Sequence, residues 1–85
     1  MSHQNNPALQ FWLKEAKVLQ KRAKSKSLSS SLPVLRRLLN AKVLINISLI
    51  ELKNNTSIIQ RKHLLQMLAS ENGASCWAEF KQQVI

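Results

Sequence analysis

Residues that form tight turns are almost absent from this chain of 85 residues, which holds one glycine and two prolines. A β-sandwich or β-barrel needs many turns, and those turns draw heavily on glycine and proline. Long helices need few of either. With 45% apolar residues, the chain is also too hydrophobic to be generally disordered. We therefore expect an all-α fold, a small single-domain bundle of four to five helices spanning residues 1–85.

The first helix is predicted over residues 7–25. Asn6 and Pro7 suit its N-cap and first helical positions. Apolar residues then recur at alternating spacings of three and four, which is typical of an amphipathic helix with coiled-coil-like spacing. These residues are Leu9, Trp12, Ala16, Leu19 and Ala23, with Leu13 beside them. Phe11 and Val18 fall on a separate face, so we expect them to meet a second layer of the bundle, another copy of the chain or a ligand.

Serine, proline and capping patterns divide the rest of the chain. Residues 25–32 are serine-rich and are predicted to be a linker, with Pro33 close to the start of the next helix. Ser48–Glu51 and Ser57–Gln60 each fit a capping box. The further helices are predicted at about 32–45, 48–53, 57–72 and 75–84.

Two details of these helices can be tested directly. Gly73 lies where a helix end needs a left-handed residue, and Ser75 is placed to cap the last helix. Residues 43–50 are apolar and β-branched enough for a buried strand, but no partner strand is evident. We expect a buried turn around Asn46 instead.

The predicted core consists of Trp12, Leu19, Leu35, Leu38, Leu65, Leu68, Trp77 and Phe80.

Catalytic and metal-binding signatures are missing from the sequence. A metal site needs several converging ligands, and the chain offers only His3, His63 and Cys76 without a paired spacing. Cys76 shares a predicted helix face with Trp77 and Phe80, which favours a buried, inert thiol. His63 is expected at the surface. We predict no catalytic residues, no metal and no cofactor, and hence a protein that is not an enzyme.

The C-terminal part of the chain carries two weaker signals. Residues 68–80 have the outline of a helix-turn-helix, but Glu79 stands where an apolar residue is usual, so a plain helical corner is favoured. Residues 61–81 resemble a segment of small uncharacterised bacterial helical proteins and domains, and residues 32–44 are similar to the same group. The shared positions are His63, Leu64, Leu65, Leu68, Ala69, Glu71, Gly73, Ser75 and Trp77. This resemblance implies a helical fold and no particular activity.

Positive charge is concentrated in the first half of the chain, whose net charge overall is +9. Residues 1–42 hold nine Lys and Arg residues and one acid, Glu15. Such a surface favours a polyanionic partner. The residues predicted to contact nucleic-acid phosphates are Lys14, Lys17, Lys21, Arg22, Lys24, Lys26, Arg36 and Arg37. Because lysines dominate, we expect contact with DNA or RNA backbone at low sequence specificity.

Several alternatives use the same residues. The basic stripe could be an ordinary solvated helix face, or the helix could lie on a membrane surface or in a partner's groove. Phe11 and Val18 could form a protein-partner or homodimer patch, with the heptad spacing as a dimer seam. Phe11 is the one candidate for an aromatic stacking platform. The single cysteine, the absence of a secretory signal and the lack of a long apolar stretch predict a cytoplasmic location without a transmembrane segment.

Overall fold

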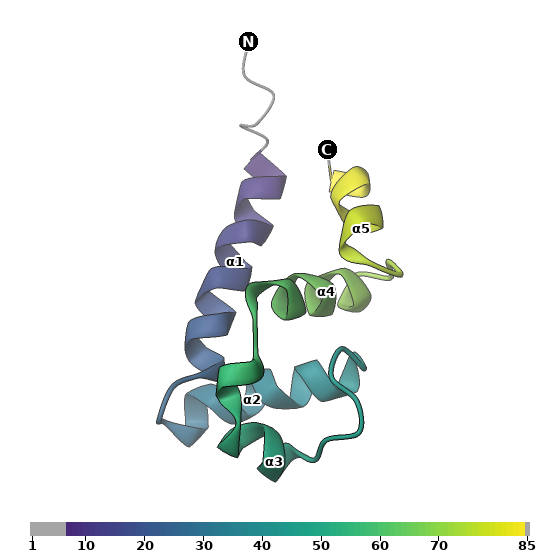
Figure 1. Ribbon diagram of the computed structural model, residues 1–85. Coiled ribbons are helices and arrows are strands. Elements are labelled where there is room, and N and C mark those ends of the chain that lie inside the picture. Colours follow the sequence, from purple (N-terminus) through teal and green to yellow (C-terminus); the bar gives the residue numbers. More distant parts are fainter. Residues whose placement is uncertain (1–6, 85) are drawn as a thin grey trace.

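Residues 7–84 are described by the computed structural model, and they form an all-α bundle without strands (Figure 1). The predicted fold class is confirmed. The N-cap expected at Asn6 and the side chain of His3 lie outside the described residues. In chain order, the elements are α1 (Pro7–Ala23), α2 (Leu28–Asn40), α3 (Leu49–Asn54), the 3-10 helix η1 (Thr56–Ile58), α4 (Arg61–Glu71) and α5 (Trp77–Val84).

Helix α1 forms the long axis of an elongated molecule of 46 × 23 × 18 Å (Figure 1). Helices α2 and α4 lie across it, α3 lies beyond α2, and α5 turns back beside the N-terminal half of α1. Helix α1 packs against α2, α4 and α5. Helix α2 crosses α1 instead of running back along it (Figure 1).

Two clusters of buried side chains make up the core. The larger cluster joins α1, α2, α3 and α4, and the smaller one holds Ala69, Ala74 and Phe80 under α5. Trp12 packs against both clusters and so connects them. Five residues of the predicted core are buried, and Trp12, Leu65 and Trp77 are half-buried. The five buried residues are Leu19, Leu35, Leu38, Leu68 and Phe80.

The linker predicted over residues 25–32 is shorter than expected, because α2 already begins at Leu28. Pro33 stands inside the helix and its ring is exposed, so it does not mark the helix start. Ser31 and Val34 are buried in the contact with the rest of the bundle. Packing of this first turn and a half outweighs the local preference of serine for loops.

Two helices end in the same hydrogen-bond pattern. Beyond α2, the N–H of Lys42 donates to Leu39 (3.1 Å) and that of Val43 to Leu38 (3.2 Å). Beyond α4, Gly73 donates to Ser70 (3.1 Å) and Ala74 to Ala69 (2.9 Å). Both are Schellman motifs, in which the residue after the C-cap is left-handed.

The left-handed residues of the two motifs differ in kind. Gly73 has φ of 85°, which confirms the prediction for it. Lys42 has φ of 59°, a conformation that a residue with a side chain adopts at a cost. Helix α2 therefore ends at Asn40, five residues before the predicted end at 45.

The segment between α2 and α3 is a turn, as predicted, but its centre is exposed, while Val43, Leu44 and Ile47 pack partly against the core. Asn46 has φ of 61° and is exposed, and Ile45 is 67% exposed. The capping box at Ser48 is confirmed: its Oγ accepts from the Glu51 N–H (3.1 Å) and Glu51 accepts from the Ser48 N–H (2.9 Å).

The second predicted capping box is wrong. Ser57 lies within η1, and α4 begins at Arg61 after the N-cap Gln60. The His63 Nδ1 accepts from the Gln60 N–H at 2.9 Å, which fills the role expected of a glutamate or glutamine. Helix α5 begins at Trp77, and Ser75 does not cap it in the expected way. Instead, both the N–H and Oγ of Ser75 donate to the Glu79 carboxylate (2.9 and 3.2 Å).

Candidate nucleic-acid interface

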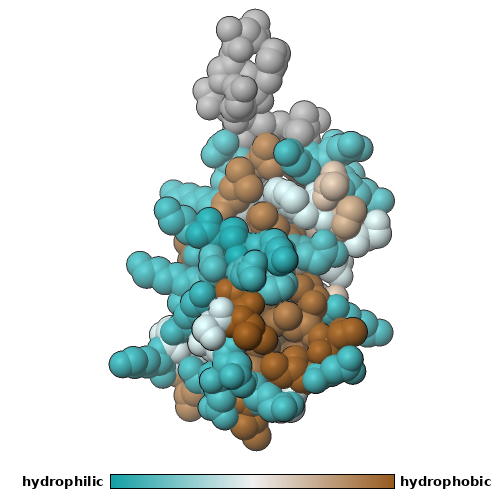
Figure 2. All heavy atoms as spheres, viewed as in Figure 1, coloured by the Kyte–Doolittle hydropathy of each residue, from teal (hydrophilic) through white to brown (hydrophobic). Residues whose placement is uncertain are grey.

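Three lysines of α1 and a fourth in the turn directly after it form one exposed face, which we call the lysine face: Lys14, Lys17, Lys21 and Lys24. It lies opposite Ala16, Leu19 and Ala23, which are the buried residues of the helix. Packing of these three residues against the core therefore leaves the lysine face turned toward solvent. With a rise of about 1.5 Å per residue, the lysine face is about 15 Å long. Within the described residues, none of these four ammonium groups has an ion-pair or hydrogen-bond partner. Figure 2 shows hydrophilic side chains projecting along the edge of the molecule where α1 lies.

The acidic side chains are engaged elsewhere in the fold. Glu71 accepts two hydrogen bonds from the Arg37 guanidinium, at 2.9 and 2.6 Å. Glu51 completes the N-terminal capping box of α3, and Glu79 accepts from Ser75. Glu15 is half-buried on α1 and acts electrostatically on Arg37 of α2. Among residues 7–84, no carboxylate forms an ion pair with a lysine of the lysine face.

The other predicted phosphate contacts do not all join the lysine face. Arg22 and Lys26 are exposed, and Arg22 lies on the flank of α1 that faces α2. Arg37 is held in the ion pair with Glu71, and this hydrogen bond raises the pKa of its guanidinium. Arg36 is exposed on the side of α2 away from its buried residues. Among the described residues, Arg37 is the only Lys or Arg in an ion pair.

Two basic residues that the sequence did not single out adjoin the lysine face. The Arg61 Nε, at the start of α4, donates to the Gln20 Oε1 of α1 at 2.6 Å. Gln20 stands one turn from both Lys17 and Lys24, so Arg61 extends this face onto α4. Lys53 donates to the Ser25 carbonyl at 3.1 Å, which places its ammonium group beside the end of α1. No local signal marks either residue, because only tertiary packing brings them to α1.

Phe11 and Val18 form an exposed patch beside the lysine face. Phe11 is 57% exposed and Val18 38% exposed, so the fold itself does not cover them. In contrast, the coiled-coil-like stripe of α1 is covered by α2, α4 and α5. That stripe is therefore not available as a dimer seam, so the heptad spacing of α1 reflects packing within the bundle.

A second exposed apolar area lies around the segment between α2 and α3. Ile45 and Ile50 are 67% and 74% exposed. Figure 2 shows apolar atoms gathered at the end of the molecule where α2, this segment and α3 lie.

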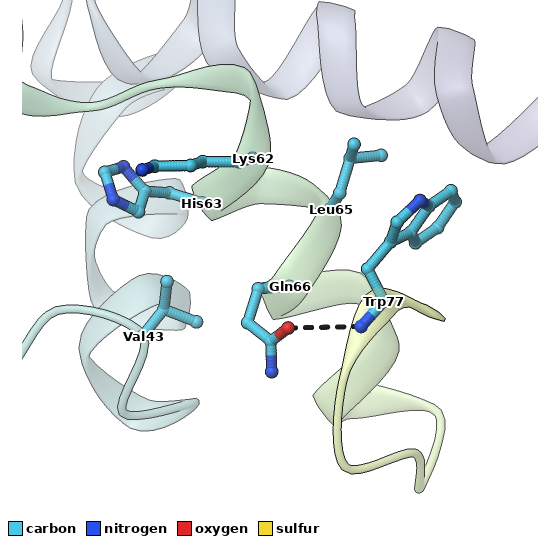
Figure 3. A pocket seen from close by; sticks show the side chains of 6 residues that line it. All are labelled: Val43, Lys62, His63, Leu65, Gln66 and Trp77. Carbon is cyan, nitrogen blue, oxygen red and sulfur yellow. Dashed lines mark hydrogen bonds between the residues drawn. The ribbon is translucent and has the colours of Figure 1, made fainter. Parts of the chain in front are cut away.

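A pocket of about 320 Å³ lies between α4, the start of α5 and the segment after α2 (Figure 3). Its lining residues are Val43, Lys62, His63, Leu65, Gln66 and Trp77. The Gln66 side chain is used structurally: its Oε1 accepts from the Trp77 N–H (3.1 Å) and its Nε2 donates to the Ser75 carbonyl (3.0 Å). These two bonds fix the corner between α4 and α5.

The burial of His63 and of Cys76 differs from the prediction for each residue. His63 is half-buried and bonded to the backbone of Gln60. Partial burial, followed by the charge of Lys62, lowers the pKa of His63. Cys76 is exposed, so the prediction of a buried thiol is wrong. It precedes α5 directly, while Phe80 occupies the buried side of that helix.

Residues 7–84 contain no cluster of three or more His, Cys, Asp or Glu side chains that could hold a metal ion. None of the helices described is long and apolar enough to cross a membrane. The corner between α4 and α5 buries Phe80 and half-buries Trp77.

Comparison of the chain with protein-family models, curated proteins and solved structures finds no match. The resemblance of residues 61–81 to small bacterial helical proteins gains no support from them.

Proposed function

We propose that this protein is a non-enzymatic binding protein that contacts the phosphate backbone of nucleic acid through the lysine face. One observation carries the proposal. Within residues 7–84, four ammonium groups without an ion-pair partner lie along one side of α1 and of the turn after it, and three of the four glutamates are engaged in contacts elsewhere. An ordinary solvated surface mixes both signs of charge, whereas this surface has one sign.

The mechanism follows from charge neutralisation. Each lysine that contacts a phosphate releases condensed counterions, so the logarithm of the affinity falls linearly with the logarithm of the salt concentration. Lysine is a compact charge on a flexible stem, which suits contact with phosphates more than reading of base edges. Little sequence specificity is expected.

The test is fluorescence anisotropy with labelled oligonucleotides over a range of salt concentrations. The variant replaces Lys14, Lys17 and Lys21 with glutamine. If each of these lysines contacts one phosphate, the salt slope becomes shallower by about 2.7 on duplex DNA and by about 2.1 on a single strand. The affinity at low salt falls in parallel.

A matched control removes the same charge from positions outside α1, with Arg36, Lys42 and Lys81 replaced by glutamine. This control has the same net charge as the first variant, so it separates a local contact from a general charge effect. The proposal predicts a slope close to that of the unaltered protein for the control. Equal losses in the two variants, or no binding by the unaltered protein at low salt, would contradict it.

A second candidate function is a protein-interaction module or a homo-oligomer. The exposure of Phe11 and Val18 favours it, because the fold leaves this patch uncovered. Light scattering of the purified protein tests the homo-oligomer. A monomer at all concentrations removes that candidate, and a dimer that dissociates when both residues become serine supports it.

A further inference from the structure

The exposed ring of Phe11 is held in place by the aromatic core. Phe11 contacts Trp12 edge-to-face, with ring centroids 5.0 Å apart and an interplanar angle of 81°. Trp12 in turn contacts the buried Phe80 at 5.3 Å, and Phe80 contacts Trp77 at 5.9 Å. All four aromatic residues of the chain thus form one connected series, with Phe11 as its exposed end. A ring supported from below and 57% exposed is a ready platform for a flat ligand.

A charged groove lies further along the same side of α1. Val18 follows Phe11 by two helical turns, about 10 Å along the axis. It borders a groove of about 390 Å³ whose other lining residues are Lys21, Arg22, Ser25 and Ser30.

A neighbouring groove of about 260 Å³, between α1 and α2, shares Arg22 and Ser30 with the first. The residues lining the two grooves include basic side chains and hydroxyl groups but no carboxylate. Such a lining suits a phosphate, since guanidinium, ammonium and hydroxyl groups all donate hydrogen bonds to its oxygens.

The charges around the patch restrict its occupant. Lys14 stands one turn from Phe11, and Lys21 and Arg22 stand one turn from Val18. Glu15 stands one turn from both Phe11 and Val18, so three cations surround the patch against one carboxylate. In a dimer of α1 helices, these cations would face their own copies, and like charges at an interface oppose association. The occupant that fits both features presents flat aromatic faces and negative charges along one strand.

We propose that the Phe11–Val18 side of α1 and its groove bind single-stranded nucleic acid, with a base stacked on Phe11 and a backbone phosphate between Lys21 and Arg22. This inference rests on the proposed function and adds the class of ligand. Base faces are covered in a duplex and open in an unpaired strand, so stacking on Phe11 selects the single strand. The lysine face alone does not make this distinction, because both forms carry phosphates.

The experiment compares a labelled oligo(dT) with a labelled duplex of equal length at one fixed low salt concentration. The unaltered protein is expected to prefer the single strand. Phe11→Ala is expected to weaken binding to the single strand by about 5- to 150-fold and to leave duplex binding unchanged. Phe11→Trp retains a stacking surface and is expected to keep the preference.

Ile50→Ala is the matched control, because Ile50 is an exposed apolar residue on α3 rather than on α1. It is expected to bind both ligands like the unaltered protein. Circular dichroism of every variant checks that the helices are retained.

Each contrary outcome has a separate meaning. Duplex binding with no effect of Phe11→Ala on the single strand overturns this inference and leaves the phosphate contact standing. Equal loss on both ligands also overturns it, since stacking would not explain the loss. A dimer that Phe11→Ala dissociates identifies the patch as a protein interface and overturns the inference. No binding to either ligand overturns it together with the proposed function.

Discussion

Replacement of Gly73 by alanine isolates the cost of one backbone conformation. Gly73 has φ of 85°, and a Cβ added there would meet no heavy atom within 4 Å. No clash therefore contributes to the effect. A left-handed residue with a side chain costs about 1–2 kcal/mol, and alanine returns about 0.4–1 kcal/mol by restricting the unfolded chain. We expect a net loss of about 0.5–1 kcal/mol in the free energy of unfolding.

Lys42 provides the opposite experiment in the same structural motif. It holds the same position in the Schellman motif of α2, with φ of 59°. Lys42→Gly relieves the backbone strain and is expected to raise the free energy of unfolding by about 0.5–1 kcal/mol. The two sites lie in different turns, so the double variant should return close to the original stability.

Thermal and urea denaturation followed by circular dichroism measure both effects. In a domain of this size, 1 kcal/mol corresponds to a shift in Tm of about 4–8 °C. A loss well above about 2 kcal/mol for Gly73→Ala would show that contacts around the turn, and not its backbone, are decisive. A loss of stability for Lys42→Gly would refute the reasoning for both positions.

Three further predictions concern other parts of the molecule. Because the pKa of His63 is lowered in the fold, the unfolded chain binds its proton more readily, and the free energy of unfolding should fall as the pH drops through about 6.5 and below. His63→Gln can keep the capping bond and should flatten the pH dependence of the free energy of unfolding, as measured by urea titrations at successive pH values. An unchanged pH profile in this variant would exclude His63 as the source of the pH dependence. Among the residues that the structure describes, the buried Oγ of Ser31 has no hydrogen-bond partner, so Ser31→Ala should raise the free energy of unfolding by about 1 kcal/mol, more than Ser30→Ala does in the same helix. An equal or smaller gain would mean that the hydroxyl is satisfied. Arg61→Gln should make the salt slope of oligonucleotide binding shallower by about 0.7–0.9, while Arg36→Gln on α2 should not, as anisotropy will show; identical slopes would place Arg61 outside the interface.

The sequence predicts much of the local structure because its signals are local. The apolar spacing of α1, the capping box at Ser48 and the left-handed Gly73 each depend on residues within a few positions of one another. It fails where packing overrides a local preference. Serines near Leu28 favour a loop, yet α2 begins there because Ser31 and Val34 are buried against the bundle.

The candidate site divides in the same way. The lysine face follows from helical periodicity alone, since side chains three and four residues apart share a side of the helix. The ion pair that occupies Arg37 joins α2 to Glu71, 34 residues further along the chain. No spacing rule can foresee a contact between helices whose crossing is set by core packing.

By itself, the sequence determined that the chain is helical, that its charge gathers on α1 and that Phe11 stands apart from the core stripe. Periodicity and composition act along one helix, so they fix which residues share a face. Only the tertiary structure decided that Arg61 and Lys53 lie beside the lysine face, that Arg22 borders a groove with Ser30, and that Trp12 and Phe80 support the ring of Phe11. These arrangements depend on how the helices cross, and the crossing is set by the packing of side chains that are distant in the sequence.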